Sequence, residues 1–144
     1  MKDIVQTTLR FVEHSLRQSN IDVTLNLKDI TAHGFPNYYS QVVMNIINNA
    51  RDALQENQVK SPSIRIKSFI SQRSKHAVLI IEDNAGGIDP EILAKIFNPY
   101  FSTKSREKGT GLGLYMSKLI IENNMKGKLS VKNTSDGACF RIEI

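Results

Sequence analysis

Residues 41–54 read QVVMNIINNARDAL, and this stretch decides how the chain folds. Its apolar side chains recur every three or four residues, which is the spacing of one buried face of an α-helix. That face consists of Val43, Ile46, Ile47, Ala50 and Leu54. At roughly 100° per residue, three polar residues fall in one narrow row beside it. This row consists of Asn45, Asn49 and Asp52.

Two interpretations of the polar row are open. It could be an exposed helix face that happens to be rich in asparagine, although asparagine is a poor helix former and Glu, Lys or Gln would serve better there. It could also be a set of ligands, because side-chain amide oxygens bind Mg²⁺ together with water and nucleotide phosphates. The row by itself does not decide between them.

Outward from this helix, the periodicity predicts alternating helices and strands. The predicted helices cover residues 2–19, 38–55, 90–96 and 111–124, and the predicted strands cover residues 21–27, 64–70, 77–82, 128–132 and 138–144. Residues 98–110 lack an apolar period and are expected to form a loop. The economical arrangement is a two-layer α/β sandwich, with helices on one face of a mixed or antiparallel sheet.

Composition narrows the class of protein. The chain has 144 residues, 40% hydrophobic and 23% charged, which fits one globular domain over residues 1–144. No apolar run is long enough to cross a bilayer, and the first residues do not resemble a secretory signal. We therefore expect a cytoplasmic domain without membrane contact. The single cysteine, Cys139, lies in an apolar strand and is expected to be a buried small hydrophobe.

The net charge of +5 does not indicate nucleic-acid binding. Most cations are dispersed, and aromatic residues are not interleaved with them as a base-stacking surface would need. The one dense group is Lys104, Arg106 and Lys108. A local phosphate site explains that group better than a nucleic-acid groove does.

Three further motifs follow the polar row along the chain. Residues 82–88, EDNAGGI, place Asp83 at a strand end, where a carboxylate can accept a proton from an exocyclic amine, although the same pattern is common in hairpins. Residues 96–104, IFNPYFSTK, carry two phenylalanines that could anchor a loop or form a small satellite core. Residues 109–114, GTGLGL, lead into a helix whose N-terminus favours phosphate.

The order of these four motifs resembles the N, G1, F and G2 boxes of the GHKL ATPase superfamily, in its histidine kinase branch. The resemblance covers nearly the whole chain. It implies the Bergerat fold, an α/β (α+β) two-layer sandwich with helices on one face of a mixed, mostly antiparallel sheet, and it implies ATP and Mg²⁺ as cofactors. The implied nucleotide-site residues are Asn45, Asn49, Asp52, Asp83, Gly87, Ile88, Phe101, Lys104, Gly109, Thr110, Gly111, Leu112, Gly113 and Leu114.

The resemblance also implies individual roles. Asn49 is expected to be the principal Mg²⁺ ligand, with Asn45 as a second contact one turn earlier. Asp83 is expected to read adenine, with Gly87 allowing close approach of the backbone to the base. Lys104 matches a basic position that can reach the γ-phosphate. Residues 109–113 resemble the phosphate loop at the end of a mobile lid.

Four positions depart from the family pattern. Ala85 stands where a glycine is common, and Ala53 replaces an aromatic residue that stacks on adenine in some members. Ala138 replaces a threonine near adenine, and Asp52 stands where some kinases carry a basic residue, so a direct phosphate contact by Asp52 is not expected. These departures leave nucleotide binding intact and imply a modest affinity, with Ile88 or Phe101 supplying contacts to the ring.

Hydrolytic relatives carry a glutamate general base where this chain has Asn45, and an amide cannot accept a proton from water at neutral pH. The resemblance therefore implies transfer of the γ-phosphate to a histidine on a separate dimerization domain, with a response regulator downstream. His14 lacks the acidic neighbour and downstream proline of a phosphoacceptor. The isolated domain is expected to be a monomer. Two alternatives stay open: a degenerate nucleotide-binding or interaction module, and an anti-sigma-type serine kinase.

Overall fold

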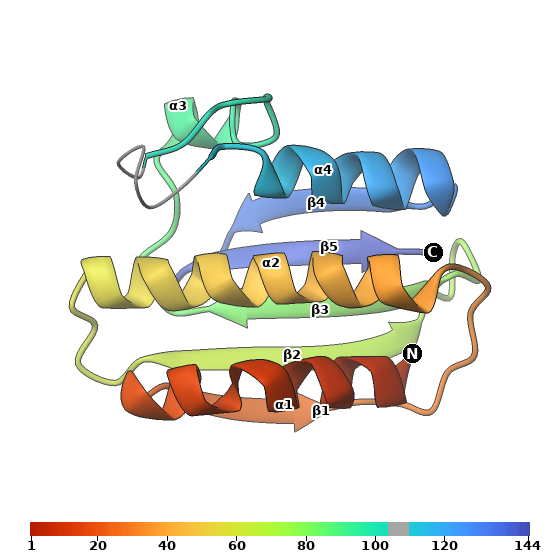
Figure 1. Ribbon diagram of the computed structural model, residues 1–144, viewed down its shortest axis with the longest axis horizontal. Coiled ribbons are helices and arrows are strands. Elements are labelled where there is room, and N and C mark those ends of the chain that lie inside the picture. The colour runs from red at the N-terminus through yellow and green to blue at the C-terminus, as the bar shows by residue number, and fades with distance from the viewer. Residues whose placement is uncertain (104–109) are drawn as a thin grey trace.

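The computed structural model describes residues 1–103 and 110–144, which form one sheet with helices on one of its faces (Figure 1). The strand order is β1-β2-β3-β5-β4. In chain order the elements are α1 (Lys2–Gln18), β1 (Asp22–Asn26), α2 (Pro36–Glu56), β2 (Ser63–Ile70), β3 (Ala77–Asp83), α3 (Pro90–Leu93), α4 (Gly113–Leu119), the π-helical segment η1 (Ile120–Asn124), β4 (Lys128–Asn133) and β5 (Ala138–Glu143).

The sheet is mixed and mostly antiparallel, as the resemblance implied. β1 runs parallel to β2 at one edge, and the other three neighbouring pairs are antiparallel. Parallel neighbours need a crossover connection, and α2 supplies it between β1 and β2. This connection lays the longest helix across the middle of the sheet (Figure 1).

α2 forms where the apolar period predicted it, and its buried face packs on the sheet. The buried residues are Tyr39, Val42, Val43, Ile46, Ile47, Ala50 and Leu54, a set that contains every residue of the predicted face. The helix begins at Pro36, two residues before the predicted start. Proline fits the first helical turn because its missing N–H would have no partner there and its φ is already helical.

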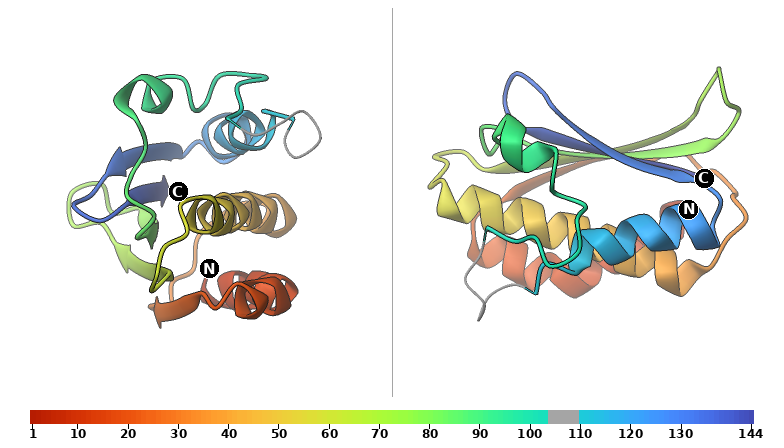
Figure 2. Two further views of the ribbon diagram at one scale, coloured as in Figure 1. Left: turned by 90° about the vertical axis from the view of Figure 1, so that its left-hand side faces the viewer. Right: turned by 90° about the horizontal axis from the view of Figure 1, so that it is seen from above.

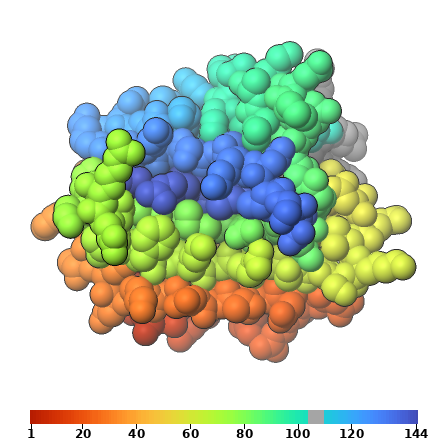
Figure 3. Space-filling view, turned by 180° about the vertical axis from the view of Figure 1, so that it is seen from behind, coloured from red at the N-terminus to blue at the C-terminus, as the bar shows by residue number. Residues whose placement is uncertain are grey.

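In the described part of the chain, the helices lie on one face of the sheet, as the two views of Figure 2 show. Strand side chains alternate accordingly: Ile64 and Ile66 of β2 are buried under the helices, while Arg65 and Lys67 are exposed on the other side. The face without helices is seen directly in Figure 3.

A small second cluster lies on that open face, formed by Val78, Ile80 and Cys139 with Phe69 packed against it. Cys139 is buried, which confirms the sequence prediction, and burial raises the pKa of its thiol. A thiol with a raised pKa is poorly ionised at neutral pH and therefore weakly nucleophilic. The only cysteine of the chain is thus a packing residue.

The last helical run starts two residues later than predicted and ends at Asn124, as predicted. It begins at Gly113 instead of residue 111, because Gly111 has a left-handed φ of +69° that no α-helix contains. A Cβ at Gly111 would overlap the backbone of Tyr100 and Phe101, so the chain crosses itself closely here. The helix ends in the π-helical segment η1.

Of the predicted loop over residues 98–110, residues 104–109 lie outside the described part. No described helix is long and apolar enough to span a bilayer.

The α2–sheet contact should dominate stability. Ile47 is fully buried in the main core, so Ile47→Ala is expected to lower the free energy of unfolding by about 2–5 kcal/mol through lost burial and a residual cavity. Urea denaturation measures this loss. Gln41→Ala, at an exposed position of the same helix, should change the stability by less than about 0.5 kcal/mol. Equal effects of the two substitutions would contradict this account of the core.

Candidate nucleotide site

A cavity of about 450 Å³ opens between the C-terminal half of α2 and the segment that carries α3 and the start of α4. α3 and the C-terminal end of α2 lie at the end of the molecule that faces the viewer in the left view of Figure 2. The size of the cavity falls in the range of small-molecule sites. Its lining comprises Asn49, Ala50, Ala53, Glu56, Asn57, Asp83, Ala85, Gly87, Ile88, Asp89, Ile92, Ile96, Phe101, Ser102, Thr103, Thr110, Gly111, Gly113, Leu114, Ala138 and Phe140.

Asp83 is the buried polar group of this cavity. It ends β3 and is 6% exposed. Its Oδ1 accepts hydrogen bonds from the backbone N–H of Ala85 (2.9 Å) and of Ala138 (3.3 Å). Burial raises the pKa of Asp83 and the nearby Glu82 adds to the rise, while the two N–H groups oppose it. Because both described hydrogen bonds reach Oδ1, Oδ2 remains as an acceptor for a donor in the cavity.

The turn after Asp83 is shaped by two consecutive glycines. Gly86 and Gly87 have φ values of +94° and +89°, a region that side chains with a Cβ rarely adopt. Ala85 is not among the residues with positive φ, so alanine is accommodated there without backbone strain. Its carbonyl accepts a hydrogen bond of 2.7 Å from the side-chain amide of Asn57. The departure from the family glycine at position 85 therefore leaves the turn intact.

The polar row of α2 divides into three environments. Asn49 lines the cavity. Asn45 does not line it, and its amide nitrogen donates to the Gly113 carbonyl (3.3 Å) and to Ser117 Oγ (3.2 Å), which ties α2 to α4. Asp52 also lies outside the lining, and its Oδ1 accepts two hydrogen bonds from Arg51, at 2.9 and 3.1 Å.

The amides of Asn45 and Asn49 suit a hard cation. Because Asn45 donates through its nitrogen, its Oδ1 is the atom left for a ligand role. Amide oxygens, water and phosphate oxygens are the donors that Mg²⁺ prefers. The described residues contain no cluster of three His, Cys, Asp or Glu side chains that could hold a metal by itself. A cation here would thus depend on amide oxygens together with oxygens of the bound molecule.

The glycine-rich segment before α4 forms the opposite wall. Thr110, Gly111, Gly113 and Leu114 line the cavity, whereas Leu112 does not. The Leu112 N–H donates to Thr110 Oγ1 at 3.3 Å. Gly87, Ile88 and Phe101 of the expected set also line the cavity, and Lys104 and Gly109 lie outside the described residues.

Several lining residues were absent from the sequence-based set. The polar ones are Glu56 and Asn57, at the end of α2, Ser102 and Thr103, and Asp89, which caps α3 by accepting from the Glu91 N–H at 2.8 Å. Ile92 and Ile96 add apolar lining. An Asp before Pro signals a helix start, and Asn after a helix signals its end, so local structure alone explains these residues in the sequence.

A one-faced α/β sandwich with a cavity between a buried carboxylate, an asparagine-bearing helix and a glycine-rich helix start is the arrangement that the resemblance to the GHKL ATPases implies. The sequence profile described as "Histidine kinase-, DNA gyrase B-, and HSP90-like ATPase" matches residues 34–144. The chain therefore belongs to this ATPase family, and its relatives and structural neighbours are those of the histidine kinase branch.

Among curated proteins, the chain is 35% identical over 139 residues to the two-component sensor PprA of Pseudomonas aeruginosa. It is 34% identical over 142 residues to the signal transduction histidine-protein kinase AtoS of Escherichia coli. These alignments cover 94% and 96% of this chain, but only 15% of PprA and 22% of AtoS. The chain thus spans a small part of each relative.

Among solved structures, the nucleotide-free catalytic domain of the histidine kinase ThkA superposes with a TM-score of 0.85 at 28% identity. The match covers 99% of this chain and 92% of that domain. ThkA has also been solved in complex with the response regulator protein TrrA, and that structure shares the fold with a TM-score of 0.78 at 24% identity.

The raised pKa of the Asp83 carboxyl predicts the direction in which a neutral substitution changes the free energy of unfolding. When folding raises the pKa of a carboxyl, the protonated form is more compatible with the folded state than the ionised form is. The carboxyl therefore lowers the free energy of unfolding as the pH rises through its folded-state pKa and it ionises. The neutral substitution Asp83→Asn should therefore increase the free energy of unfolding at pH 7. Urea titrations at several pH values test this. The gain should shrink as the pH falls toward about 3.9, the ordinary pKa of aspartate; a destabilised variant at pH 7 would contradict the sign.

Proposed function

We propose that this chain is the catalytic domain of a two-component sensor histidine kinase, with residues 1–144 as one domain. In this proposal it binds Mg²⁺-ATP and donates the γ-phosphate to a histidine on a separate dimerization domain, and a response regulator acts downstream. The observation that carries the proposal is that the buried Asp83 and Asn49 of α2 line one cavity.

The part of the cavity around the buried Asp83 suits adenine. Asp83 Oδ2 would accept a hydrogen bond from the exocyclic amine, and a charged acceptor makes this bond stronger than a neutral one. Ile88 and Phe101 offer apolar surface to the faces of the ring. Ala53 and Ala138 line the same cavity, and their small side chains leave room beside the base.

The phosphate end would need added positive charge. Besides Asp83 at the adenine end, the cavity lining includes the carboxylates of Glu56 and Asp89, and it includes no Lys, Arg or His among the described residues. A triphosphate placed there meets like charge unless a cation accompanies it. Bound Mg²⁺ would screen the phosphates, and Asn49 and Asn45 would hold it through their amide oxygens. Lys104, outside the described residues, remains the proposed γ-phosphate contact.

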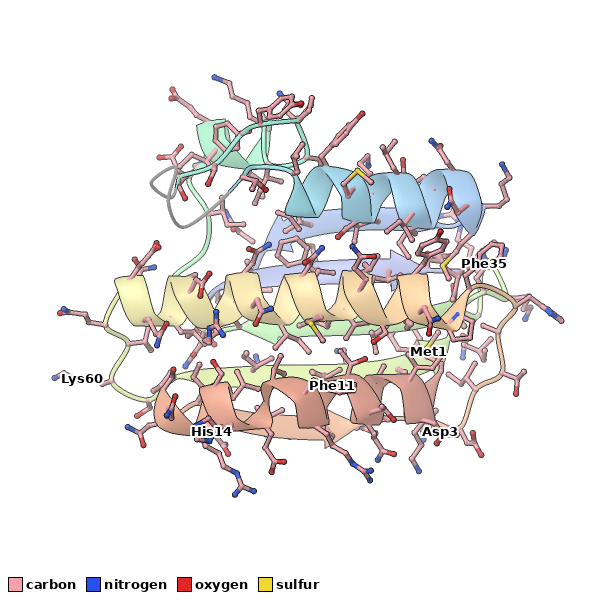
Figure 4. The ribbon with its side chains drawn as sticks, in the orientation of Figure 1. Met1, Asp3, Phe11, His14, Phe35 and Lys60 are labelled. Carbon is pink, nitrogen blue, oxygen red and sulfur yellow. The ribbon has the colours of Figure 1, made fainter. Side chains whose placement is uncertain are left out.

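The residues favour transfer over hydrolysis. Asn45 occupies the place of the general base in hydrolytic relatives, and its amide is engaged with Gly113 and Ser117. An amide at that place cannot take a proton from water. His14 is exposed on α1, which lies on the far side of α2 from the cavity (Figures 1 and 4), so it is badly placed to receive phosphate. The acceptor histidine would come from a partner domain in the cytoplasm.

Two substitutions test the nucleotide assignment. Asn49→Ala should remove most of the Mg²⁺-dependent part of ATP affinity, and Asp83→Asn should weaken ATP with or without Mg²⁺. Losing a hydrogen bond or ligand contact to a charged group costs about 1.5–3 kcal/mol, or roughly tenfold to a hundredfold in affinity. Isothermal titration calorimetry measures both. Asn48→Ala, an asparagine of the same helix outside the cavity lining, is the matched control and should bind like the unaltered chain. Unaltered affinity in both site variants would remove the assignment.

A second experiment tests the transfer step. Incubated with radiolabelled ATP, the isolated chain should hydrolyse ATP slowly and acquire no label, because transfer needs the acceptor imidazole held in line with the γ-phosphate. Adding the dimerization domain of the same kinase should produce acid-labile label on the histidine of that domain. Acid-labile label on His14 of the isolated chain would defeat the proposal.

A further inference from the structure

The glycine turn, residues 83–88, is a segment with little intrinsic order. Gly86 and Gly87 both lie in the left-handed region. Glycine loses more conformational freedom on folding than any other residue, so two in succession make a turn that is costly to fix. Ile88, which follows them, lines the cavity and is half-buried. Something outside the turn must hold its backbone in place.

The turn between β4 and β5, residues 133–138, provides that hold. Asn133 Oδ1 accepts a hydrogen bond of 2.8 Å from the Ile88 N–H, and its Nδ2 donates one of 2.7 Å to the Ile88 carbonyl. The Gly86 N–H donates to the Asp136 carbonyl at 2.9 Å. A side chain far along the sequence thus engages both backbone groups of one residue, as a neighbouring strand would.

We propose that Asn133 is a positioning residue of the nucleotide site, which holds Ile88 and the glycine turn in the conformation that receives the base. This inference rests on the proposed function. Asn133 is exposed and does not line the cavity, so it acts through Ile88 and not by touching the nucleotide.

The chemistry of the side chain explains why asparagine suits this position. A primary amide carries a donor and an acceptor in the same arrangement as a peptide group, so it can satisfy an N–H and a C=O together. Aspartate lacks the donor, and alanine lacks both. The amide also fits against the turn: a Cβ at Gly87 would lie 3.1 Å from Asn133 Oδ1, a separation tighter than ordinary contact.

Removing this hold should loosen the turn in the free protein, and binding would then have to order it. This ordering would weaken the contacts made at the base-binding end of the cavity. The phosphate end is built from Asn49 of α2 and the segment from Thr110 to Leu114, which Asn133 does not contact in the described hydrogen bonds. The affinities of ATP and of AMP should therefore fall by the same factor, while the effect of Mg²⁺ on ATP binding stays unchanged.

Calorimetric titration of the whole chain with ATP and with AMP, each with and without Mg²⁺, tests this inference. Asn133→Ala should weaken both nucleotides roughly five- to twentyfold, as expected for two lost hydrogen bonds. Asn133→Asp keeps an acceptor for the Ile88 N–H but sets a carboxylate oxygen against the Ile88 carbonyl, and it should weaken both as well. Circular dichroism at the titration temperature verifies that each variant is folded.

Lys132→Ala is the matched control. Lys132 precedes Asn133 on β4, is exposed and lies outside the cavity lining. This variant should fold normally and keep its nucleotide affinity. Unaltered affinity in both Asn133 variants would overturn the positioning role alone, as would an equal loss in Lys132→Ala. Absence of nucleotide binding by the unaltered chain would instead remove the proposed function, and the role of Asn133 with it.

Discussion

The carboxylate of Asp83 is the group around which the binding end of the molecule is arranged. A buried carboxylate must be satisfied by the chain, since its desolvation otherwise costs several kcal/mol. Here the N–H groups of Ala85 and Ala138 supply that compensation to one oxygen. The bond from Ala138 joins the end of β3 to the start of β5, and the bond from Ala85 holds the turn that follows β3. The junction is tight enough that a Cβ at Gly137 would overlap Asp83, so a glycine is required on the β5 side. Asp83 lines the cavity, and the described hydrogen bonds reach only its Oδ1, which leaves Oδ2 as an acceptor for a bound molecule.

α2 contributes both to the wall of the cavity and to the hydrophobic core. α2 buries one face on the sheet and presents Asn49 to the cavity from another. Asn45, one turn earlier, is bonded to Gly113 and Ser117, so the glycine-rich start of α4 is fixed to the same helix. One 21-residue element therefore determines both the packing of the domain and the spacing of the two walls. Substitutions on its two faces are accordingly expected to have separable effects on stability and on binding.

Much of this could be predicted from the sequence because the informative patterns are local. The 3.6-residue period located α2, the alternation located the strands, and the motif order indicated the fold. Asp83, Gly87 and Gly111 were singled out by the order of the four motifs, because a strand-end acid before glycines is also common in hairpins and a glycine-rich helix start is weak evidence by itself. The strand order was not predicted, since periodicity identifies strands without their neighbours.

The remaining site residues escaped prediction for a physical reason. Asn133 contacts Ile88 across 45 residues of sequence, and Asn57 contacts Ala85 across 28, so in the sequence both look like ordinary residues at the ends of elements. Asp52 is the opposite case, a residue that the sequence placed in the polar row and that pairs with another residue of its own helix. Its place in the polar row is helical geometry, but its carboxylate pairs with Arg51, which also donates to Ser15 of α1 at 2.6 Å. Periodicity fixes the direction of a Cα–Cβ bond and not the partner that the side chain finds.

The central claim is that adenine nucleotide binds in the cavity between Asp83 and the glycine-rich start of α4. The most direct measurement is a ¹H–¹⁵N correlation spectrum of the whole chain, recorded while a non-hydrolysable ATP analogue and Mg²⁺ are added. The account predicts that the largest amide shifts occur at residues 83–88, 49–57 and 110–114, with little change at exposed α1 positions such as Phe11 and His14. Absent shifts, or shifts concentrated on α1 or the open face of the sheet, would contradict it.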